Sequence, residues 1–180
     1  MRRGPSSIVI LAAWLAAGSA GAQSPPAPPR PGPETTKLAY FVGRWRSESQ
    51  MKPGPFGPGG RVSGTDTCEW FSGGFHLICR SEGKGALGDV KGMSIISWDP
   101  DEKAYSYYAF DHRGITEQAR GTFDGTTWTW SSESSMSGRA VKGRYTIVAQ
   151  GPAAYTFKWE ASLDGAPLAV VMEGKGSKAR

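Results

Sequence analysis

Residues 41–45 read Phe-Val-Gly-Arg-Trp and open the first strand-like run of the chain. From here to the C-terminus, short segments rich in aromatic and β-branched residues alternate with clusters of glycine, proline and aspartate, and almost no segment has helical periodicity. The pair Gly43 and Trp45 at the head of such a series indicates a β-barrel that closes on itself. We expect Trp45 to be a structural residue of that barrel.

The rest of the pattern predicts ten strands, preceded by a short helical turn at 37–42. The predicted strands span residues 43–51, 61–71, 75–82, 90–98, 103–110, 115–123, 126–132, 139–149, 155–162 and 167–174. The joining segments carry turn residues, such as Asp124-Gly125, a pair that favours a type I′ hairpin. Consecutive strands without intervening helices indicate an all-β fold. We expect a single antiparallel meander barrel of about eight to ten strands, or else a sandwich.

The first 36 residues precede this domain. Residues 1–22 have the features of a secretory signal peptide: a basic start, a short apolar core and the cleavage sequence Ala20-Gly21-Ala22. The apolar core is too short to span a bilayer comfortably. Residues 23–36 contain six prolines and are expected to form a disordered linker. The barrel domain then covers residues 37–180, a length that suits one hydrophobic core.

The signal sequence predicts a periplasmic or secreted protein that begins at Gln23, after cleavage behind Ala22. Removing Arg2 and Arg3 from the 21 basic residues leaves 19 against 16 acidic ones, so the net charge falls from +5 to +3. The remaining basic residues are dispersed, which argues against a nucleic-acid surface. We expect no stable membrane insertion after cleavage, and the sequence leaves the oligomeric state open.

The two cysteines, Cys68 and Cys79, lie symmetrically about Gly73-Gly74. A two-residue turn there places them directly across a hairpin, and an oxidising compartment favours a disulfide. Counted from that turn they form a hydrogen-bonded pair, with Cα atoms about 5.5 Å apart, unless a longer loop changes the register. Two reduced, packed thiols are the alternative. The register predicts an inward face of Cys68, Trp70, Phe75, Leu77 and Cys79, and an outward face of Glu69, Phe71, His76, Ile78 and Arg80.

No motif of a known catalytic site occurs in the chain. The sequence has no Gly-x-Ser-x-Gly elbow, no Gly-x-Gly-x-x-Gly fingerprint and no P-loop. His76 and His112 are too few for a three-histidine metal site. We therefore expect no catalytic residue, no metal and no cofactor, and an enzyme is the least favoured class. Residues 111–113 (Asp-His-Arg) are interpreted as a turn in which the aspartate caps backbone amides, with a rim contact to a polar ligand as the alternative.

Four short motifs occur in a fixed order, at residues 38–45, 73–75, 97–100 and 121–125. Together they resemble the bacterial family called domain of unknown function 1579, a calycin-like group, over most of residues 38–174. The resemblance implies a lipocalin-like β-barrel and no established activity. In lipocalins a basic residue of the last strand packs across the ring of the Gly-x-Trp tryptophan. Here the candidates are Lys175, Lys178 and Arg180.

A barrel of this kind is expected to bind a small, partly apolar molecule in its interior. The residues predicted to line that ligand are Trp70, Tyr107, Glu117, Trp128, Tyr145 and Trp159. The loop at 52–60, with Phe56 at its centre, is interpreted either as a lid or as a surface connector. The alternative function is a filled barrel that presents its loops to a protein or to the cell envelope and has no small ligand.

Glu117 is the one acidic residue among the predicted lining residues. It shares a strand face with Ala119, so it points either into the barrel or, equally compatible with the sequence, away from it. An inward carboxylate needs a partner such as Arg120, Arg144 or a group of the ligand, because an unpaired buried charge is costly.

Overall fold

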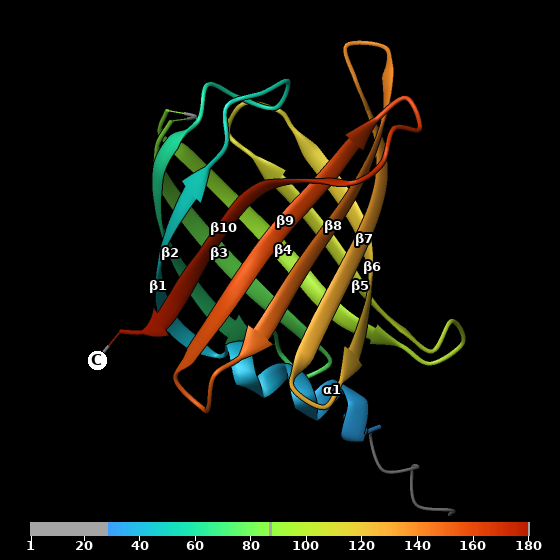
Figure 1. The fold of residues 1–180 in the computed structure, drawn as a ribbon. Helices are drawn as coiled ribbons and strands as arrows, with labels where there is room; N and C mark the ends of the chain where they lie inside the picture. Colours follow the sequence, from blue (N-terminus) through green and yellow to red (C-terminus); the bar gives the residue numbers. More distant parts are fainter. Residues whose placement is uncertain (1–28, 87, 180) are drawn as a thin grey trace, which may run out of the picture.

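The computed structural model describes residues 29–86 and 88–179, which form one closed antiparallel sheet of ten strands (Figure 1). The strands are β1 (Gly43–Met51), β2 (Gly60–Trp70), β3 (His76–Gly85), β4 (Val90–Asp99), β5 (Ala104–Asp111), β6 (Thr116–Asp124), β7 (Thr127–Met136), β8 (Arg139–Ala149), β9 (Ala154–Leu163) and β10 (Ala169–Lys178). The predicted all-β barrel is confirmed. The predicted signal peptide, its cleavage site and residues 23–28 of the predicted linker lie outside the described residues.

The sheet closes because β1 pairs with β10 as well as with β2. The other strands pair in chain order, as a meander requires. The largest extensions beyond the predicted strand ends are in β7, which continues to Met136, and in β10, which continues to Lys178, the residue paired with Trp45. In the extension of β10, Gly176 takes the inward position because the ring of Tyr155 occupies the space that a side chain would need. The sequence there shows no apolar alternation for that reason.

Two short helices lie across one end of the barrel, which we call the closed end (Figure 1). They are α1 (Pro33–Lys37) and the 3₁₀ helix η1 (Leu38–Phe41). The hydroxyl of Tyr105, on β5, donates a hydrogen bond to the backbone carbonyl of Glu34 at 3.0 Å. This contact and the complete burial of Leu38 fix the helices to the barrel wall.

The helices confirm one prediction and correct another. The helical turn expected at 37–42 is present as η1. The expectation of a disordered linker as far as residue 36 is wrong for residues 33–36, because α1 includes them and Thr35 is buried. Proline is well suited to the first turn of a helix, so Pro33 starts α1 instead of excluding it. No helix in the described part of the chain is long and apolar enough to cross a membrane.

Aromatic rings fill the barrel above these helices. Trp128 packs edge-on against Phe41 and Tyr105, with ring centroids 5.1 and 4.9 Å apart. Trp130 lies parallel to Trp128 at 6.3 Å. The buried rings of this layer, which we call the aromatic floor, are Phe41, Trp45, Tyr105, Trp128, Trp130, Tyr155 and Phe157. Interlocking edge-to-face contacts of this kind stabilise a core beyond the burial of apolar area alone.

Trp45 joins the helices, the first strand and the last strand. Its indole N–H donates to the carbonyl of Phe41 at 2.9 Å, and only 2% of the residue is exposed. The ammonium group of Lys178 lies 5.2 Å from the centre of a Trp45 ring, within the range of a cation–π interaction. Lys178 is therefore the basic partner among the three candidates. Lys175 points outward, and Arg180 lies outside the described residues.

The Cys68–Cys79 disulfide is present and links directly opposed residues of β2 and β3. The N–H of Phe71 donates to the carbonyl of His76 at 2.8 Å, so residues 72–75 form a four-residue loop. The prediction of a two-residue turn is therefore wrong. The longer loop moves the cysteines to a non-hydrogen-bonded position, with Cα atoms 4.0 Å apart. Such positions bring cross-strand side chains closer than hydrogen-bonded ones.

The two predicted faces of the cysteine hairpin are confirmed, because the change of loop length does not alter which residues face each other. The residues predicted inward are buried or half-buried: Cys68, Trp70, Phe75, Leu77 and Cys79. Of those predicted outward, Ile78 is half-buried, and the exposed ones are Glu69, Phe71, His76 and Arg80.

Reduction of the disulfide is expected to lower the free energy of unfolding by about 2–3 kcal/mol, because the bridge closes a short loop in the unfolded chain. Urea denaturation with and without a phosphine reductant measures this difference. The control is the double variant C68S/C79S, which should unfold at the same urea concentration in both conditions. Equal stability of the oxidised and reduced parent protein would contradict the expectation.

Candidate functional site

Above the aromatic floor the barrel interior becomes polar. Side chains alternate between the two faces of a strand, so the buried residue on each strand shows which neighbours point inward. The inward side chains of this region are Asp66, Ser81, Ser94, Tyr107, Glu117, Ser132, Tyr145 and Trp159. Tyr145 lies opposite both Trp159 and Trp130 in the sheet register. We call the space that these side chains enclose the upper lumen.

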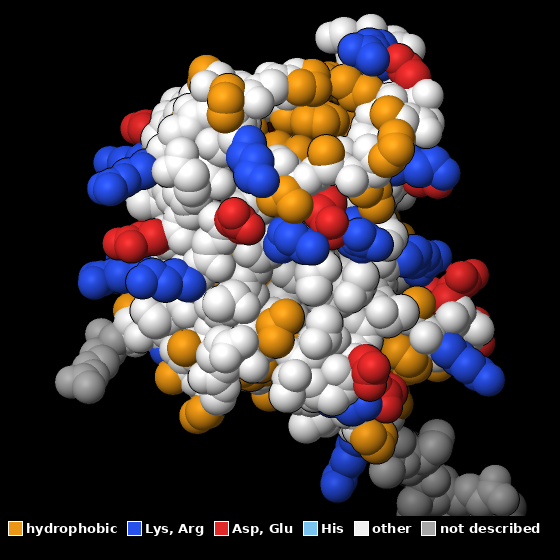
Figure 2. Space-filling view, in the orientation of Figure 1, with side chains coloured by type: hydrophobic (Ala, Val, Ile, Leu, Met, Phe, Trp, Pro, Cys, Tyr) orange, Lys and Arg blue, Asp and Glu red, His pale blue; other side chains and the backbone are white. Residues whose placement is uncertain are grey.

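The inward side chains of the upper lumen keep accessible surface. Tyr107 and Tyr145 project from the middle of their strands into the barrel, yet both keep accessible surface, and at that depth this surface faces the lumen. Glu117 is exposed although it shares the inward face of β6 with the buried Ala119. Below them the floor is sealed, since only 6% of Trp130 is exposed. Figure 2 shows hydrophobic side chains around a recess at the open end of the barrel.

Asp66 and Glu117 place two carboxyl groups in the upper lumen. Burial raises the pKa of Asp66, and a hydrogen bond donated by the Ser81 hydroxyl partly offsets this effect. Water reaches Glu117, but the surrounding wall restricts its hydration and raises its pKa, with Ser132 as the offsetting hydrogen-bond donor. The orientation of Glu117, which the sequence left open, is inward, because Glu117 lies opposite Ala109 of β5 and on the same face of β6 as the buried Ala119.

The two arginines considered as partners of Glu117 are engaged elsewhere. Arg120 donates to the hydroxyl of Ser106 at 2.6 Å on the outer wall. Arg144 donates to the carboxylate of Glu160 at 2.9 Å. In the described part of the chain, neither Asp66 nor Glu117 forms an ion pair. Of the three partners considered for an inward Glu117, only a group of the ligand therefore remains.

Three tyrosine hydroxyls lie around the same carboxylates. Burial raises the pKa of Tyr107, Tyr145 and Tyr155, and the negative charge of Asp66 adds to the increase at each of them. The charge of Glu117 contributes at Tyr107 and Tyr145. All three side chains are therefore neutral hydroxyls near pH 7, able both to donate and to accept hydrogen bonds.

The residues predicted to line a ligand divide into two groups. Four of them lie together in the upper lumen: Tyr107, Glu117, Tyr145 and Trp159. Trp128 and Trp70 do not belong to it, and their assignment is corrected. Trp128 is 1% exposed within the aromatic floor, and Trp70 packs against the core at the closed end of β2. Both point inward, as the alternation predicts, but alternation does not give depth along the barrel axis.

Sequence reasoning missed the second carboxylate and the serines of the upper lumen. Asp66 lies two residues before Cys68 on β2, and Ser81 lies two residues after Cys79 on β3. Extending the inward face of the cysteine hairpin by one step on each strand would have identified both residues. Ser94 and Ser132 follow in the same way from Ile96 and Trp130.

The loop between β1 and β2 lies at the open end (Figure 1). Its central residue, Phe56, packs edge-on against Trp159 with ring centroids 5.6 Å apart. The backbone N–H of Lys52 donates to the carbonyl of Val171 at 2.8 Å. A cavity of about 440 Å³ separates the loop from the β9–β10 connection. Contact between Phe56 and a luminal tryptophan favours the interpretation of this loop as a lid.

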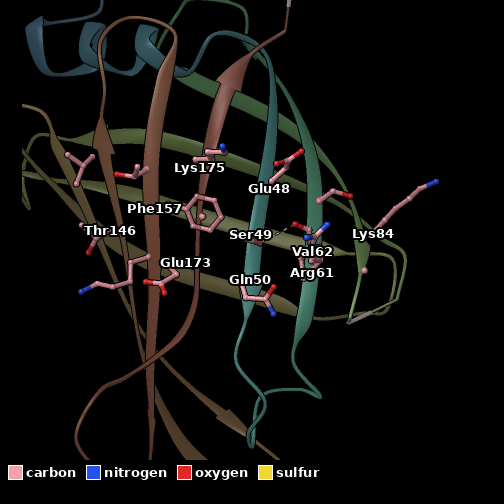
Figure 3. A pocket seen from close by; sticks show the side chains of 16 residues that line it. Glu48, Ser49, Gln50, Arg61, Val62, Lys84, Thr146, Phe157, Glu173 and Lys175 are labelled. Carbon is pink, nitrogen blue, oxygen red and sulfur yellow. Dashed lines mark hydrogen bonds between the residues drawn. The ribbon is translucent and has the colours of Figure 1, made fainter.

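A second pocket, of about 1200 Å³, is larger than the cavity beside the loop. It extends along the wall formed by β8, β9, β10, β1, β2 and β3 (Figure 3). Its charged side chains are on outward positions of those strands: Glu48, Arg61, Lys84, Lys158, Glu173 and Lys175. These charges have both signs and are open to solvent, where water and salt weaken their interactions. The upper lumen is the better candidate, because it combines enclosure with convergent polar groups.

The cluster at 111–113 is a turn at the rim. The carboxylate of Asp111 accepts hydrogen bonds from the backbone N–H groups of Arg113 and Ile115 at 2.9 and 3.1 Å. This geometry confirms the capping interpretation. Within residues 29–86 and 88–179, no group of three histidine, cysteine, aspartate or glutamate residues is placed to hold a metal ion.

Comparisons with known proteins address the fold. The sequence model of one family, described as protein of unknown function (DUF1579), matches residues 30–174. No curated protein matches the chain in sequence. The structure of Rv2717c from M. tuberculosis is similar, with a TM-score of 0.59 and 12% identity over 83% of this chain and 99% of that one.

Two further solved structures are similar to this chain to a lower degree. The S-type phycobiliprotein lyase CPES from Guillardia theta has a TM-score of 0.52 and 12% identity, over 81% of this chain and 92% of the lyase. EF1p2_mFAP2b bound to DFHBI has a TM-score of 0.45 and 8% identity, over 81% of this chain and 98% of that one. At 12% identity, the likeness to Rv2717c and to the lyase extends to the fold alone.

Replacing Glu117 by glutamine is expected to raise the melting temperature at pH 7. The folded-state pKa of Glu117 is raised, so its contribution to stability is present below its ordinary pKa of 4.5 and is lost as pH rises through the folded-state value. A neutral amide avoids that loss. Thermal unfolding should therefore show E117Q above the parent at pH 7 and close to it at pH 3.

The matched control for E117Q is Glu160→Gln. Arg144 lowers the pKa of Glu160 through a hydrogen bond, so the ionised form stabilises the folded state at neutral pH. E160Q should therefore melt below the parent at pH 7. A melting temperature of E117Q below that of the parent at pH 7 would show that the Glu117 carboxylate is well accommodated in the lumen.

Proposed function

This chain belongs to the DUF1579 family of proteins of unknown function, and we propose that it is an exported barrel that binds a small, partly apolar molecule in its upper lumen. The observation that carries this proposal is that the aromatic floor fills the closed end of the barrel but not the space above it. Above the floor, polar side chains with accessible surface line most of the interior, and a small apolar cluster of Met51, Ala161 and Val171 lies near the open end. A protein interior is normally close-packed, so an enclosed, unfilled region with convergent polar groups is characteristic of a binding site.

The composition of the upper lumen suits a partly apolar ligand. Trp130 and Trp159 present aromatic surface below and beside the space, while Tyr107 and Tyr145 supply hydroxyl groups. Apolar surface contributes affinity and a few placed polar groups orient the ligand. Phe56, held against Trp159, closes the open end over the bound molecule in this proposal.

Export is proposed from the N-terminal signal at residues 1–22 and is supported by the disulfide. Bridges between cysteines persist in oxidising compartments such as the periplasm and the cell exterior. The Cys68–Cys79 disulfide fits that environment. The ligand proposed for the upper lumen is accordingly one that the protein meets outside the cytoplasm.

A protein-interaction module is the second candidate. It is favoured by exposed aromatic side chains on the outer wall, where Tyr108 and Phe110, two residues apart on β5, are 46% and 48% exposed. Exposed aromatic side chains in a group often mark an interaction surface. This function makes no use of the upper lumen, so a test of luminal binding separates the two candidates.

Filling the upper lumen is expected to abolish binding of N-phenyl-1-naphthylamine, a neutral apolar fluorophore. Ala109 lies on the inward face of β5, opposite Ser94 and Glu117, so Ala109→Trp occupies the space between them. Fluorescence titration should show binding to the parent and a loss of at least about tenfold in affinity for A109W.

Gln118→Trp is the control for A109W, because Gln118 is exposed on the outward face of β6 and the substitution adds the same side chain outside the barrel. Q118W should bind the fluorophore as the parent does. No binding by the parent protein, or equal affinity of A109W and the parent, would contradict luminal binding and favour the interaction module.

A further inference from the structure

We propose that the upper lumen selects ligands that carry a positive charge or hydrogen-bond donors, preferably an aromatic amine, and discriminates against carboxylic acids. This inference rests on the proposed luminal binding and adds the chemical class of the ligand. It follows from the distribution of charge on the inward face of the barrel.

The described inward-facing side chains of the upper lumen include two carboxylates and no basic group. The carboxylates are Asp66, on β2, and Glu117, on β6. The uncharged polar members are hydroxyls: Ser81, Ser94, Tyr107, Ser132 and Tyr145. A carboxylate is only an acceptor of hydrogen bonds when ionised, so this lining offers acceptors in excess.

Basic side chains on the surrounding strands are bound outside the upper lumen. Arg144 pairs with Glu160 on the outer wall, and Arg139 pairs with Asp164 at the rim. Lys178 points inward, but its ammonium group lies over the ring of Trp45 at the closed end. No positive charge of the described wall therefore compensates the luminal carboxylates.

Three carboxylates elsewhere in the protein differ from Asp66 and Glu117, because each has a basic partner. Hydrogen bonds from Lys37, Arg144 and Arg139 lower the pKa values of Glu34, Glu160 and Asp164, respectively. For Asp66 and Glu117 the only offsetting partners are serine hydroxyls, and the net shift is upward. A cationic or donor group placed beside either carboxylate would supply the favourable interaction that no basic side chain of the protein provides there.

The surrounding rings favour an aromatic or cationic partner as well. Tyr107 lies 5.7 Å from Trp130 between ring centroids, and Tyr145 lies 5.4 Å from Phe157 in a stacked arrangement. The faces of such rings attract cations and stack with planar groups. An anionic ligand meets the opposite conditions, because two like charges in an enclosed site repel it and no cation neutralises it.

Three naphthalene derivatives that differ in one group test this selectivity: 2-naphthylmethylamine, 2-naphthalenemethanol and 2-naphthoic acid. Isothermal titration calorimetry at pH 7 measures their affinities for the purified protein. We expect the amine to bind at least about tenfold more tightly than the acid, with the alcohol between them. The preference should weaken at high salt, as charge interactions do.

Removal of the luminal charges should reduce the preference. Glu117→Gln and Asp66→Asn should each weaken binding of the amine and strengthen binding of the acid, and either variant alone suffices if the other does not fold. Glu173→Gln removes a carboxylate from an exposed outward position of β10 and should leave all three affinities unchanged. An unchanged preference in E117Q and D66N would overturn the assignment.

The outcomes separate this inference from the proposed function on which it rests. Equal affinities, or tighter binding of the acid, overturn the selectivity and leave luminal binding intact. Failure of all three compounds overturns the selectivity for this chemical class, and if N-phenyl-1-naphthylamine also fails to bind, the proposed function falls with it.

Discussion

The hydrogen-bonded pairing of β1 with β10 is the constraint on which the rest of the structure depends. It removes the free edges of the sheet and directs every second side chain of ten strands into one enclosed space. Ordinary aliphatic residues would leave so wide an interior poorly packed, and large rings together with η1 fill its closed end. Trp45, between Phe41 and Lys178, joins these parts where the first and last strands meet.

The same closure explains why the open end can hold a ligand. Rings that pack against one another support the wall from below, and the small apolar cluster of Met51, Ala161 and Val171 supports it near the open end. Asp66 and Glu117 then occupy positions where burial opposes their ionisation. Such residues reduce the stability of the empty protein, and their retention in an enclosed site is typical of groups that serve binding.

Much of the fold follows from short-range sequence patterns. Alternation along β9 and around the cysteines predicts the strands, the inward faces and the disulfide. The loop at 72–75 was misjudged because two glycines suggest a tight turn, whereas hydrogen bonding across the hairpin decides the length. Residues 33–36 were misjudged because proline-rich composition hides a helix that tertiary contacts hold. Trp128 and Glu117 show how far the binding site could be predicted from the sequence. Alternation shows which face of a strand points inward, but only the closed barrel shows how deep a residue lies and which charged groups surround it.

Accessibility of single cysteines along the barrel axis tests the central claim most directly, that an empty polar lumen lies above a sealed aromatic floor. Ser81→Cys places a thiol in the upper lumen, and Ala119→Cys places one on the same inward surface at the level of the floor. Reaction with methyl methanethiosulfonate, followed by mass spectrometry of the folded protein, should label the first rapidly and the second only on unfolding. Equal protection of both thiols in the native protein would contradict the account.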